Sequence, residues 1–282
     1  MSKVVKNMVK DIMRNMEMVD MHVHLHDANY GGELGEVMSR AREQGVGLIV
    51  CNATSQRDWG EVLGLAKEYT EIVPFLGVHP MYMAGRSGDW LEQLEEIAGH
   101  NRCGIGEIGL DRREGAGDEG EQDEVFISQM ELAARLDLPA TIHCVRAWGR
   151  MIELLGKIRR PRRMLFHAYG GSAELVKELT ELGGYFSFAA TMLDERHRHS
   201  RESLAVVRLD RLMLETDSPD LIGPDGKRLY FKVVSEKFLR NEPANVALVY
   251  KGVAELLSVG EEKLKEQVYE NARRFLAGVV DL

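Results

Sequence analysis

Two histidines separated by one residue stand at the end of the first apolar run, in the sequence Asp20-Met21-His22-Val23-His24. In an extended strand, side chains two positions apart point to the same face, so we expect Asp20 to share the face of His22 and His24. Met21 and Val23 would then take the other face. Two imidazoles on one face are spaced as the ligands of a divalent metal ion need to be. A pair of surface histidines would have the same spacing, so the pattern alone leaves both interpretations open.

Four more ionisable residues follow apolar runs elsewhere in the chain: Glu107, His143, His167 and Asp217. A charge buried without a partner is costly, and the apolar neighbours offer none. Bound cations explain such imidazole and carboxylate groups better than mutual hydrogen bonds. Together with the two histidines, these residues predict a metal site, and four nitrogens with two carboxylates suit two ions that share one carboxylate. Such ligands fit Zn²⁺, Mn²⁺ or Fe²⁺, and fit Mg²⁺ less naturally.

Eight short apolar or β-rich runs alternate with helix-compatible stretches along the sequence. This alternation favours parallel strands joined by helical crossovers, and eight such units in 282 residues fit a TIM (β/α)8 barrel of the α/β class. We find no linker, so we expect a single domain over residues 1–282; an open, doubly wound sheet is the alternative. In a barrel, the ionisable residues would meet at the C-terminal ends of the strands. The runs are Met18–Leu25, Gly47–Cys51, Ile72–Gly77, Cys103–Ile108, Ala140–Cys144, Met164–His167, Tyr185–Ala189 and Arg211–Thr216.

Residues 104–109 read GIGEIG and match the GxGxxG pattern of dinucleotide-binding sites. That pattern requires its glycines to follow a strand and open a helix. Here the glycines fall inside a strand-like run, and a loop rich in glycine and acidic residues follows. The context argues against a nicotinamide or flavin site. We expect the glycines to bring the backbone of Glu107 close to its neighbours instead.

The composition is that of an ordinary globular protein, with 44% hydrophobic and 29% charged residues. A formal net charge of −9 argues against a surface that coats nucleic acid, so a phosphate-bearing partner would be gripped by a few local cations. No apolar run approaches the length of a membrane span. Cys51, Cys103 and Cys144 are too scattered for a disulfide framework or a zinc ribbon, which favours a reducing, cytoplasmic compartment.

Apolar residues recur at helical spacing in the first 16 residues, which predicts an amphipathic helix. No continuous apolar segment follows the basic residues there, so the segment does not read as a secretory signal. We expect the helix to pack on the body of the domain, and a transient contact with a membrane or a partner is the alternative.

Eight short motifs, in order over nearly the whole chain, resemble those of the TatD-like metal-dependent hydrolases, a family of the amidohydrolase-like superfamily usually described as deoxyribonucleases. The resemblance implies a TIM barrel and a nuclease activity that depends on divalent metal ions. The motifs are DMHVHL at 20–25, GVHP at 77–80, GEIGLD at 106–111, HCVR at 143–146, HAYG at 167–170, ETDSP at 215–219, NEP at 241–243 and NARRF at 271–275.

The resemblance also assigns roles to individual residues. It implies that one metal ion is held by His22 and His24 together with Asp217. It implies that His143 and His167 hold a second ion, and that the carboxylate of Glu107 bridges the two. The resemblance further places His79 beside the substrate, where a histidine that merely caps its loop is the alternative.

Two loops depart from the family pattern. The loop at residues 218–245 lacks the usual short, proline-rich and basic approach to NEP, and the loop at 191–203 carries Arg196, Arg198 and Arg201. We expect both loops to flank the barrel mouth. The three arginines would contact an anionic substrate or form a solvated surface.

Four residues near the predicted site have competing interpretations. Asp20 would orient an imidazole or make a plain buried hydrogen bond. The planar guanidinium of Arg146 would bind a substrate phosphate or pair with Glu153. Glu215 would be an outer ligand or a polar brace in the core. Cys144 adjoins a predicted ligand but has no base arranged for nucleophilic work, so we expect it to belong to the core.

The predicted reaction is hydrolysis by a metal-activated water. Asp217 would touch both metal and water and act as general base, with Glu107 as the second catalytic residue. The resemblance makes the phosphodiester bonds of DNA the leading substrate. One alternative is a hydrolase of a small lactone, cyclic amide or phosphoester. Another is a non-catalytic metal-binding or partner-binding protein, against which the presence of all six ligands argues.

Overall fold

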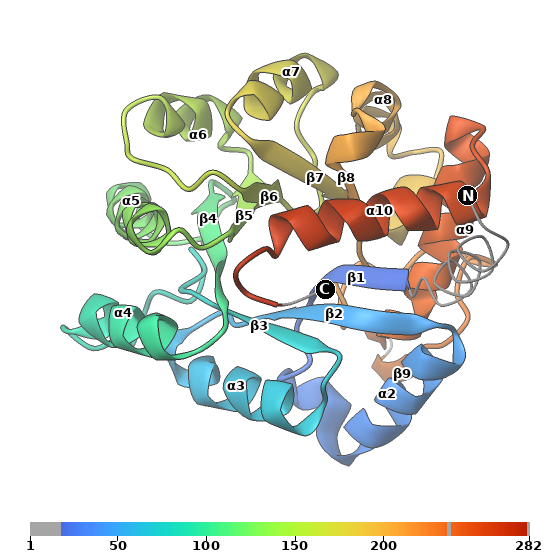
Figure 1. Cartoon of the computed structure of the whole chain (residues 1–282), viewed down its shortest axis with the longest axis horizontal. Helices are drawn as coiled ribbons and strands as arrows, with labels where there is room; N and C mark the ends of the chain where they lie inside the picture. Colours follow the sequence, from blue (N-terminus) through green and yellow to red (C-terminus); the bar gives the residue numbers. More distant parts are fainter. Residues whose placement is uncertain (1–17, 236–237, 281–282) are drawn as a thin grey trace, which may run out of the picture.

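Eight parallel strands form a nearly closed barrel in the computed structural model, which describes residues 18–235 and 238–280 (Figure 1). The strands follow one another around the barrel in sequence order. The first and last strands meet where Val23 pairs with Ser218 and the His24 N–H donates to the Ser218 carbonyl at 2.7 Å. The predicted TIM barrel is confirmed, and the open sheet is excluded. The strands are β1 Met18–Val23, β2 Val46–Asn52, β3 Ile72–Leu76, β4 Gly104–Asp111, β5 Ala140–Val145, β6 Met164–Phe166, β7 Gly184–Phe188 and β8 Leu212–Leu214.

The alternation expected in β1 is wrong at its C-terminal end. The buried apolar residues form two clusters. Met21 packs in one of them with Leu165 and Phe275, and Val23 packs in the second, although strict alternation would put Met21 and Val23 on the same face. The register of β1 against β2 shifts between Asp20 and Val23, which is a bulge or similar irregularity. Such irregularities re-aim side chains and are common next to active sites.

Helices surround the barrel, and one predicted loop needs correction. Helix α5 begins at Glu119, because the Asp118 carboxylate caps it by accepting the Glu121 N–H at 2.8 Å. The predicted loop at 191–203 is helical from Arg198 onward. The helices are α2 Leu34–Glu43, α3 Trp59–Glu68, α4 Trp90–His100, α5 Glu119–Leu136, α6 Trp148–Leu155, α7 Ala173–Glu181, α8 Arg198–Val206, α9 Val246–Leu257 and α10 Glu261–Phe275.

Helix α10 packs against the N-terminal ends of the strands (Figure 1). The Asn271 amide donates to the carbonyls of Leu209 and Leu212, both at 2.7 Å, just where β8 begins. Phe275 at the end of the helix stacks on Phe75 of β3, with ring centroids 6.1 Å apart. This end of the barrel is therefore filled, and the opposite end is left for a site.

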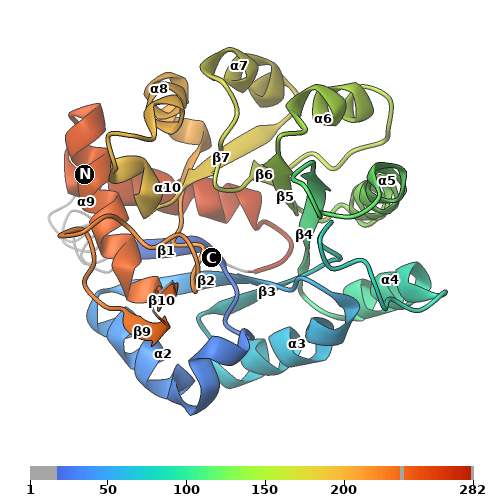
Figure 2. The ribbon, with the colours of Figure 1, turned by 180° about the vertical axis from the view of Figure 1, so that it is seen from behind.

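A two-stranded hairpin, β9 Lys232–Ser235 and β10 Phe238–Arg240, interrupts the predicted loop at 218–245, so the expectation of a plain loop there is wrong. Figure 2 shows the hairpin beside α2, on the side of the barrel away from α10. Buried Arg240 fixes it by donating to Glu33 at 3.0 Å and to Glu242 at 2.9 Å.

The helix predicted for residues 1–16 lies outside the described residues. Within residues 18–235 and 238–280, the structure has no helix that is both long and apolar enough to cross a membrane.

Candidate active site

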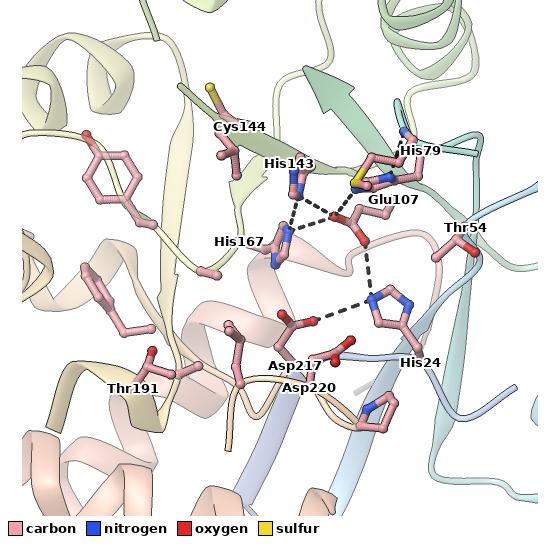
Figure 3. A pocket seen from close by; sticks show the side chains of 18 of the residues that line it. His24, Thr54, His79, Glu107, His143, Cys144, His167, Thr191, Asp217 and Asp220 are labelled. Carbon is pink, nitrogen blue, oxygen red and sulfur yellow. Dashed lines mark hydrogen bonds and ion pairs between the residues drawn. The ribbon is translucent and has the colours of Figure 1, made fainter. Parts of the chain in front are cut away.

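All six predicted metal ligands lie together at the C-terminal end of the barrel. Figure 3 shows His24, His143 and His167 around the carboxylates of Glu107 and Asp217. They come from strands or from the residues just after them, so the fold of the barrel itself brings them together. The contributions are His22 from β1, His24 just after β1, Glu107 from β4, His143 from β5, His167 after β6 and Asp217 after β8.

The two carboxylate oxygens of Glu107 face different histidine pairs. Its Oε2 lies 3.3 Å from Nε2 of His22 and 3.3 Å from Nε2 of His24. Its Oε1 lies 2.9 Å from Nδ1 of His143 and 2.8 Å from Nε2 of His167. Asp217 joins the first group, because its Oδ1 lies 3.6 Å from His22 Nε2 and 3.5 Å from His24 Nε2. One carboxylate thus separates two groups of ligand atoms.

Hydrogen bonds from outside the site turn two of the imidazole lone pairs inward. His24 donates from Nδ1 to the backbone carbonyl of Asn52 at 2.8 Å, so its neutral ring keeps a lone pair on Nε2. His143 donates from Nε2 to Asp111 at 3.1 Å, which leaves the lone pair on Nδ1. Both lone pairs face the Glu107 carboxylate. Outer partners of this kind hold histidine ligands in the correct tautomer in metal proteins.

The electrostatics of the site favour a charged carboxylate at Glu107. Burial by itself would raise the pKa of Glu107. The surrounding imidazoles, His167 first among them, outweigh burial when they are protonated and hold that pKa well below its usual range. A buried carboxylate facing several imidazoles is a donor set suited to a borderline divalent cation. The residues present therefore fit the predicted metal ions.

A close approach between β4 and β5 positions His143. Gly109 pairs with His143 across the two strands and has φ +153°. A Cβ on Gly109 would lie 1.9 Å from the His143 carbonyl oxygen, so no larger residue fits without moving the strand. Gly106 is similarly crowded, with Asn52 Oδ1 2.8 Å from a Cβ built there. The predicted packing role of these glycines is confirmed, and β4 continues past Glu107 to Asp111 without opening a helix.

Asp20 does not contact an imidazole among the described residues. Its carboxylate accepts the Thr216 N–H at 2.9 Å and the Thr216 hydroxyl at 2.6 Å. The interpretation that Asp20 orients an imidazole is therefore wrong, and the plain buried hydrogen bond describes it. The reason is that the segment just after β8 brings the backbone N–H and hydroxyl of Thr216 next to Asp20.

Glu215 is fully buried below the site. Its Oε1 accepts the Ala168 N–H at 2.7 Å and lies 3.6 Å from Nδ1 of His167. Glu215 therefore braces the segment that carries His167. Together with His22 and His167 it also forms a group compact enough to hold an ion.

His79 lies against the Glu107 carboxylate, with its Nε2 3.3 Å from Oε1. The Met81 N–H donates to Nδ1 of His79 at 3.1 Å, so the proton of the neutral ring is on Nε2. Burial lowers the pKa of His79 to about 4, which keeps the ring neutral at physiological pH. The side chain can donate a hydrogen bond from Nε2 into the cavity, and its contact with a substrate stays a prediction.

The basic residues predicted to hold phosphate are less centrally placed. Arg146 is exposed and does not line the cavity, and the acid predicted as its partner, Glu153, pairs with Arg150 and Lys157 instead. The phosphate contact of Arg146 stays a prediction. In the loop at 191–203, Arg196 pairs with Asp194 and Arg198 with Glu202, while the neighbouring His197 and Ser200 line the cavity.

A cavity of about 640 Å³ opens above the ligands. Residues 19–277 of the chain match the family of TatD related DNases. The chain belongs to this family. In this TatD family member, a barrel thus carries histidines and carboxylates at the C-terminal ends of its strands.

Individual TatD proteins resemble the chain over most of its length. It is 30% identical over 271 residues to the putative deoxyribonuclease TATDN3 of Mus musculus, which covers 91% of this chain and 87% of that protein. It is 29% identical over 261 residues to the 3'-5' ssDNA/RNA exonuclease TatD of Erwinia tasmaniensis, covering 91% and 98%. The crystal structure of YjjV, a TatD homologue from Escherichia coli, superposes with a TM-score of 0.83 at 26% identity, covering 93% of this chain and 98% of that chain.

Sequence reasoning missed several residues of this TatD family site. Asp111 holds His143, and its position at the end of the GEIGLD motif was the available signal. Tyr82, Arg113 and Asp220 line the cavity from loops that follow three strands. Nothing in their spacing marks them, because they reach the cavity only through the path of each loop. Cys144 is 8% exposed and also touches the cavity, although most of its side chain packs in the core as predicted.

Proposed function

We propose that the protein is a metal-dependent nuclease that hydrolyses phosphodiester bonds in single-stranded DNA or RNA. The observation that carries the proposal is the Glu107 carboxylate, whose two oxygens face two separate groups of ligand atoms inside a cavity. The names of the TATDN3 and TatD relatives support the choice of nucleic acid as substrate.

Two divalent ions fit this arrangement. The first would be held by His22, His24 and Asp217 and the second by His143 and His167, with Glu107 between them. Zn²⁺ and Mn²⁺ suit these ligands best, and Mg²⁺ suits them less well. When bound, the ions would bring the pKa of a water towards neutrality and polarise the scissile phosphate.

Asp217 is the residue best placed to accept a proton from the attacking water. Its Oδ1 faces the first histidine pair, and its side chain is 12% exposed to the cavity. Burial would raise the pKa of Asp217, but the neighbouring imidazoles of His24 and His22, when protonated, hold it below its ordinary value. Asp217 is therefore a carboxylate at neutral pH, as a general base must be. His79 would donate from Nε2 to an oxygen of the substrate.

A small uncharged ester or lactone is the second candidate substrate. Asp27 and Asp220 line the cavity close to Asp217, and their charges oppose a polyanion at that side. A neutral substrate would meet no such repulsion. Phosphodiesters remain the first choice because the guanidinium of Arg113, from the loop after β4, also lines the cavity.

Chelation and reconstitution test the proposal. Exhaustive chelation is expected to abolish cleavage of a single-stranded oligonucleotide, and added Mn²⁺, Zn²⁺ or Mg²⁺ to restore it. Circular dichroism should not change, because a core of this size folds without ions. Full activity of the metal-free protein would contradict the proposal. Turnover of lactones with no cleavage of DNA, RNA or small phosphodiesters would replace it with the second candidate.

We also propose that the barrel acts as one domain and that the protein works in the cytoplasm. The first strand and the last helices belong to the same unit, since Tyr250 of α9 exchanges hydrogen bonds with the backbone of Val19 in β1. Cys51, Cys103 and Cys144 are buried free thiols, as expected for a reducing compartment.

A further inference from the structure

The rim of the cavity differs in charge and shape around its circumference. The loops after β3 and β4 contribute Met81, Tyr82 and Arg113. The loops after β1 and β8 contribute Asp27 and Asp220. Figure 3 shows Asp220 beside Asp217, away from the side on which His79 lies. One part of the rim is thus aromatic and cationic, and another part is acidic.

Tyr82 presents an exposed aromatic ring on the first part of the rim. The side chain is 52% exposed, and its ring centroid lies 5.6 Å from that of His79. Because His79 contacts Glu107 at 3.3 Å, only one side chain separates Tyr82 from the bridging carboxylate. Large aromatic side chains usually lose most of their exposure on folding, so an exposed ring beside a polar cavity is available to a ligand.

The loop that carries Tyr82 is held in place by contacts below it. The Gln129 side chain both accepts the Val78 N–H at 2.7 Å and donates to the Val78 carbonyl at 3.1 Å. The Tyr82 N–H donates to the His79 carbonyl at 2.9 Å, and the next side chain, Met83, is buried. The ring is therefore presented by a fixed backbone, which reduces the entropy lost when a ligand binds.

Arg113 places a positive charge next to this ring. Its Nε donates to Asp111 Oδ2 at 2.9 Å, and the side chain is 47% exposed. No hydrogen bond joins its Nη1 to another described residue, so this edge of the guanidinium is free for an oxyanion. The same Asp111 carboxylate accepts a hydrogen bond from Nε2–H of His143, with Nε2 3.1 Å from Oδ2. An anion on Arg113 would therefore lie one side chain away from a predicted metal ligand.

We propose that Tyr82 and Arg113 form a nucleotide subsite on the rim, in which Tyr82 stacks on an unpaired base and Arg113 binds the phosphate next to the scissile one. Stacking on an aromatic side chain requires a base with an open face, which a single strand offers and a duplex hides. The subsite rests on the proposed nuclease function and explains why the substrate must be single-stranded.

The acidic part of the rim determines the path by which a nucleic-acid strand would leave the cavity. Asp27 and Asp220 repel phosphates, so the backbone leaves the cavity over Tyr82 and Arg113 rather than over the β1 and β8 loops. The formal net charge of −9 adds to this effect, because the protein as a whole repels a polyanion. Only a few nucleotides close to the cleaved bond would touch the protein.

A double-mutant cycle between Tyr82 and the base tests the subsite. One partner is the Tyr82→Ala change, and the other is the replacement of the bases next to the scissile bond by abasic residues in a single-stranded oligonucleotide. Binding is measured by fluorescence anisotropy in the Asp217→Asn background, and KM is measured in the otherwise unchanged protein. For the unmodified protein, the abasic strand should bind roughly 5- to 100-fold more weakly than the normal strand, as expected for one stacked base.

In Tyr82→Ala this ratio should fall to about one, and Tyr82→Phe should keep it because stacking needs only the ring. Arg113→Met should weaken binding of both strands and reduce the salt slope of binding by about one unit. Phe231→Ala is the matched control, since Phe231 is 47% exposed but does not line the cavity. It should change neither the ratio nor the slope.

Three results would distinguish a failure of the subsite from a failure of the nuclease function. An unchanged ratio in Tyr82→Ala, with cleavage intact, refutes the stacking proposal and leaves the nuclease function standing. A ratio that depends on Tyr82 in a protein that cleaves no phosphodiester refutes the nuclease function and keeps the subsite. Absence of any oligonucleotide binding by the metal-loaded protein refutes both.

Discussion

The Asp111 carboxylate accepts a hydrogen bond from Nε2–H of His143, with Nε2 and Oδ2 3.1 Å apart. The other ring nitrogen of His143, Nδ1, lies 2.9 Å from Oε1 of Glu107. Arg113 holds the same Asp111 carboxylate from the solvent side, with Nε 2.9 Å from Oδ2. A carboxylate outside the ligand set thus selects the tautomer of a residue inside it. Partners in this position raise the basicity of a ligating histidine.

Replacement of Asp111 should therefore weaken metal binding while leaving the barrel folded. We expect Asp111→Asn to lower metal affinity by roughly 10- to 100-fold, because the uncharged amide polarises His143 less. Competition with a chromophoric chelator measures the affinity. Asp123→Asn is the control, since Asp123 pairs with Arg112 and Arg150. Equal affinities of Asp111→Asn and the unmodified protein would show that the hydrogen bond has no such role.

Asp217→Asn should separate catalysis from metal binding. Asparagine still offers an oxygen towards His22 and His24 but cannot accept a proton. We expect the variant to keep most of its metal and to lose kcat by roughly 10²- to 10⁴-fold, as for removal of a general base. Steady-state kinetics together with elemental analysis checks both parts. A variant with normal kcat would remove Asp217 from the chemistry.

Asn271 offers a prediction about stability. Its amide donates to the carbonyls of Leu209 and Leu212 in a fully buried position, so Asn271→Ala would leave both carbonyls without that partner. The free energy of unfolding should fall by about 1–3 kcal/mol, the cost of unsatisfied buried polar groups. Urea denaturation measures the change. Lys263→Ala, on the exposed face of the same helix, should have little effect, and an equal loss in both variants would refute the explanation.

The NEP and NARRF motifs could be recognised in the sequence, but their roles could not be read there. Asn241 of NEP donates to the carbonyls of Thr216 at 3.1 Å and Asp220 at 2.9 Å, and so holds the turn that carries Asp217. The two partners are more than 20 residues away along the chain. Such contacts depend on where the hairpin returns to the barrel, which local spacing does not encode.

The fold and the ligand groups were predictable for a different reason. Each strand has an apolar run, and the ionisable residue comes at its end, so the barrel topology alone brings His143 and His167 to the same place as Glu107. The prediction failed where side chains depend on loops or irregular backbone. Tyr82 and Arg113 reach the rim through their loops, and the register shift in β1 changes the faces of Met21 and Val23.

The metal stoichiometry of Glu107→Gln tests most directly whether Glu107 bridges two metal ions. The unmodified protein, reconstituted and dialysed, should hold two ions per chain by elemental analysis. Glu107→Gln removes the negative charge shared by the His22–His24 and His143–His167 pairs, and we expect it to hold at most one ion. Two tightly bound ions in Glu107→Gln would contradict the bridge.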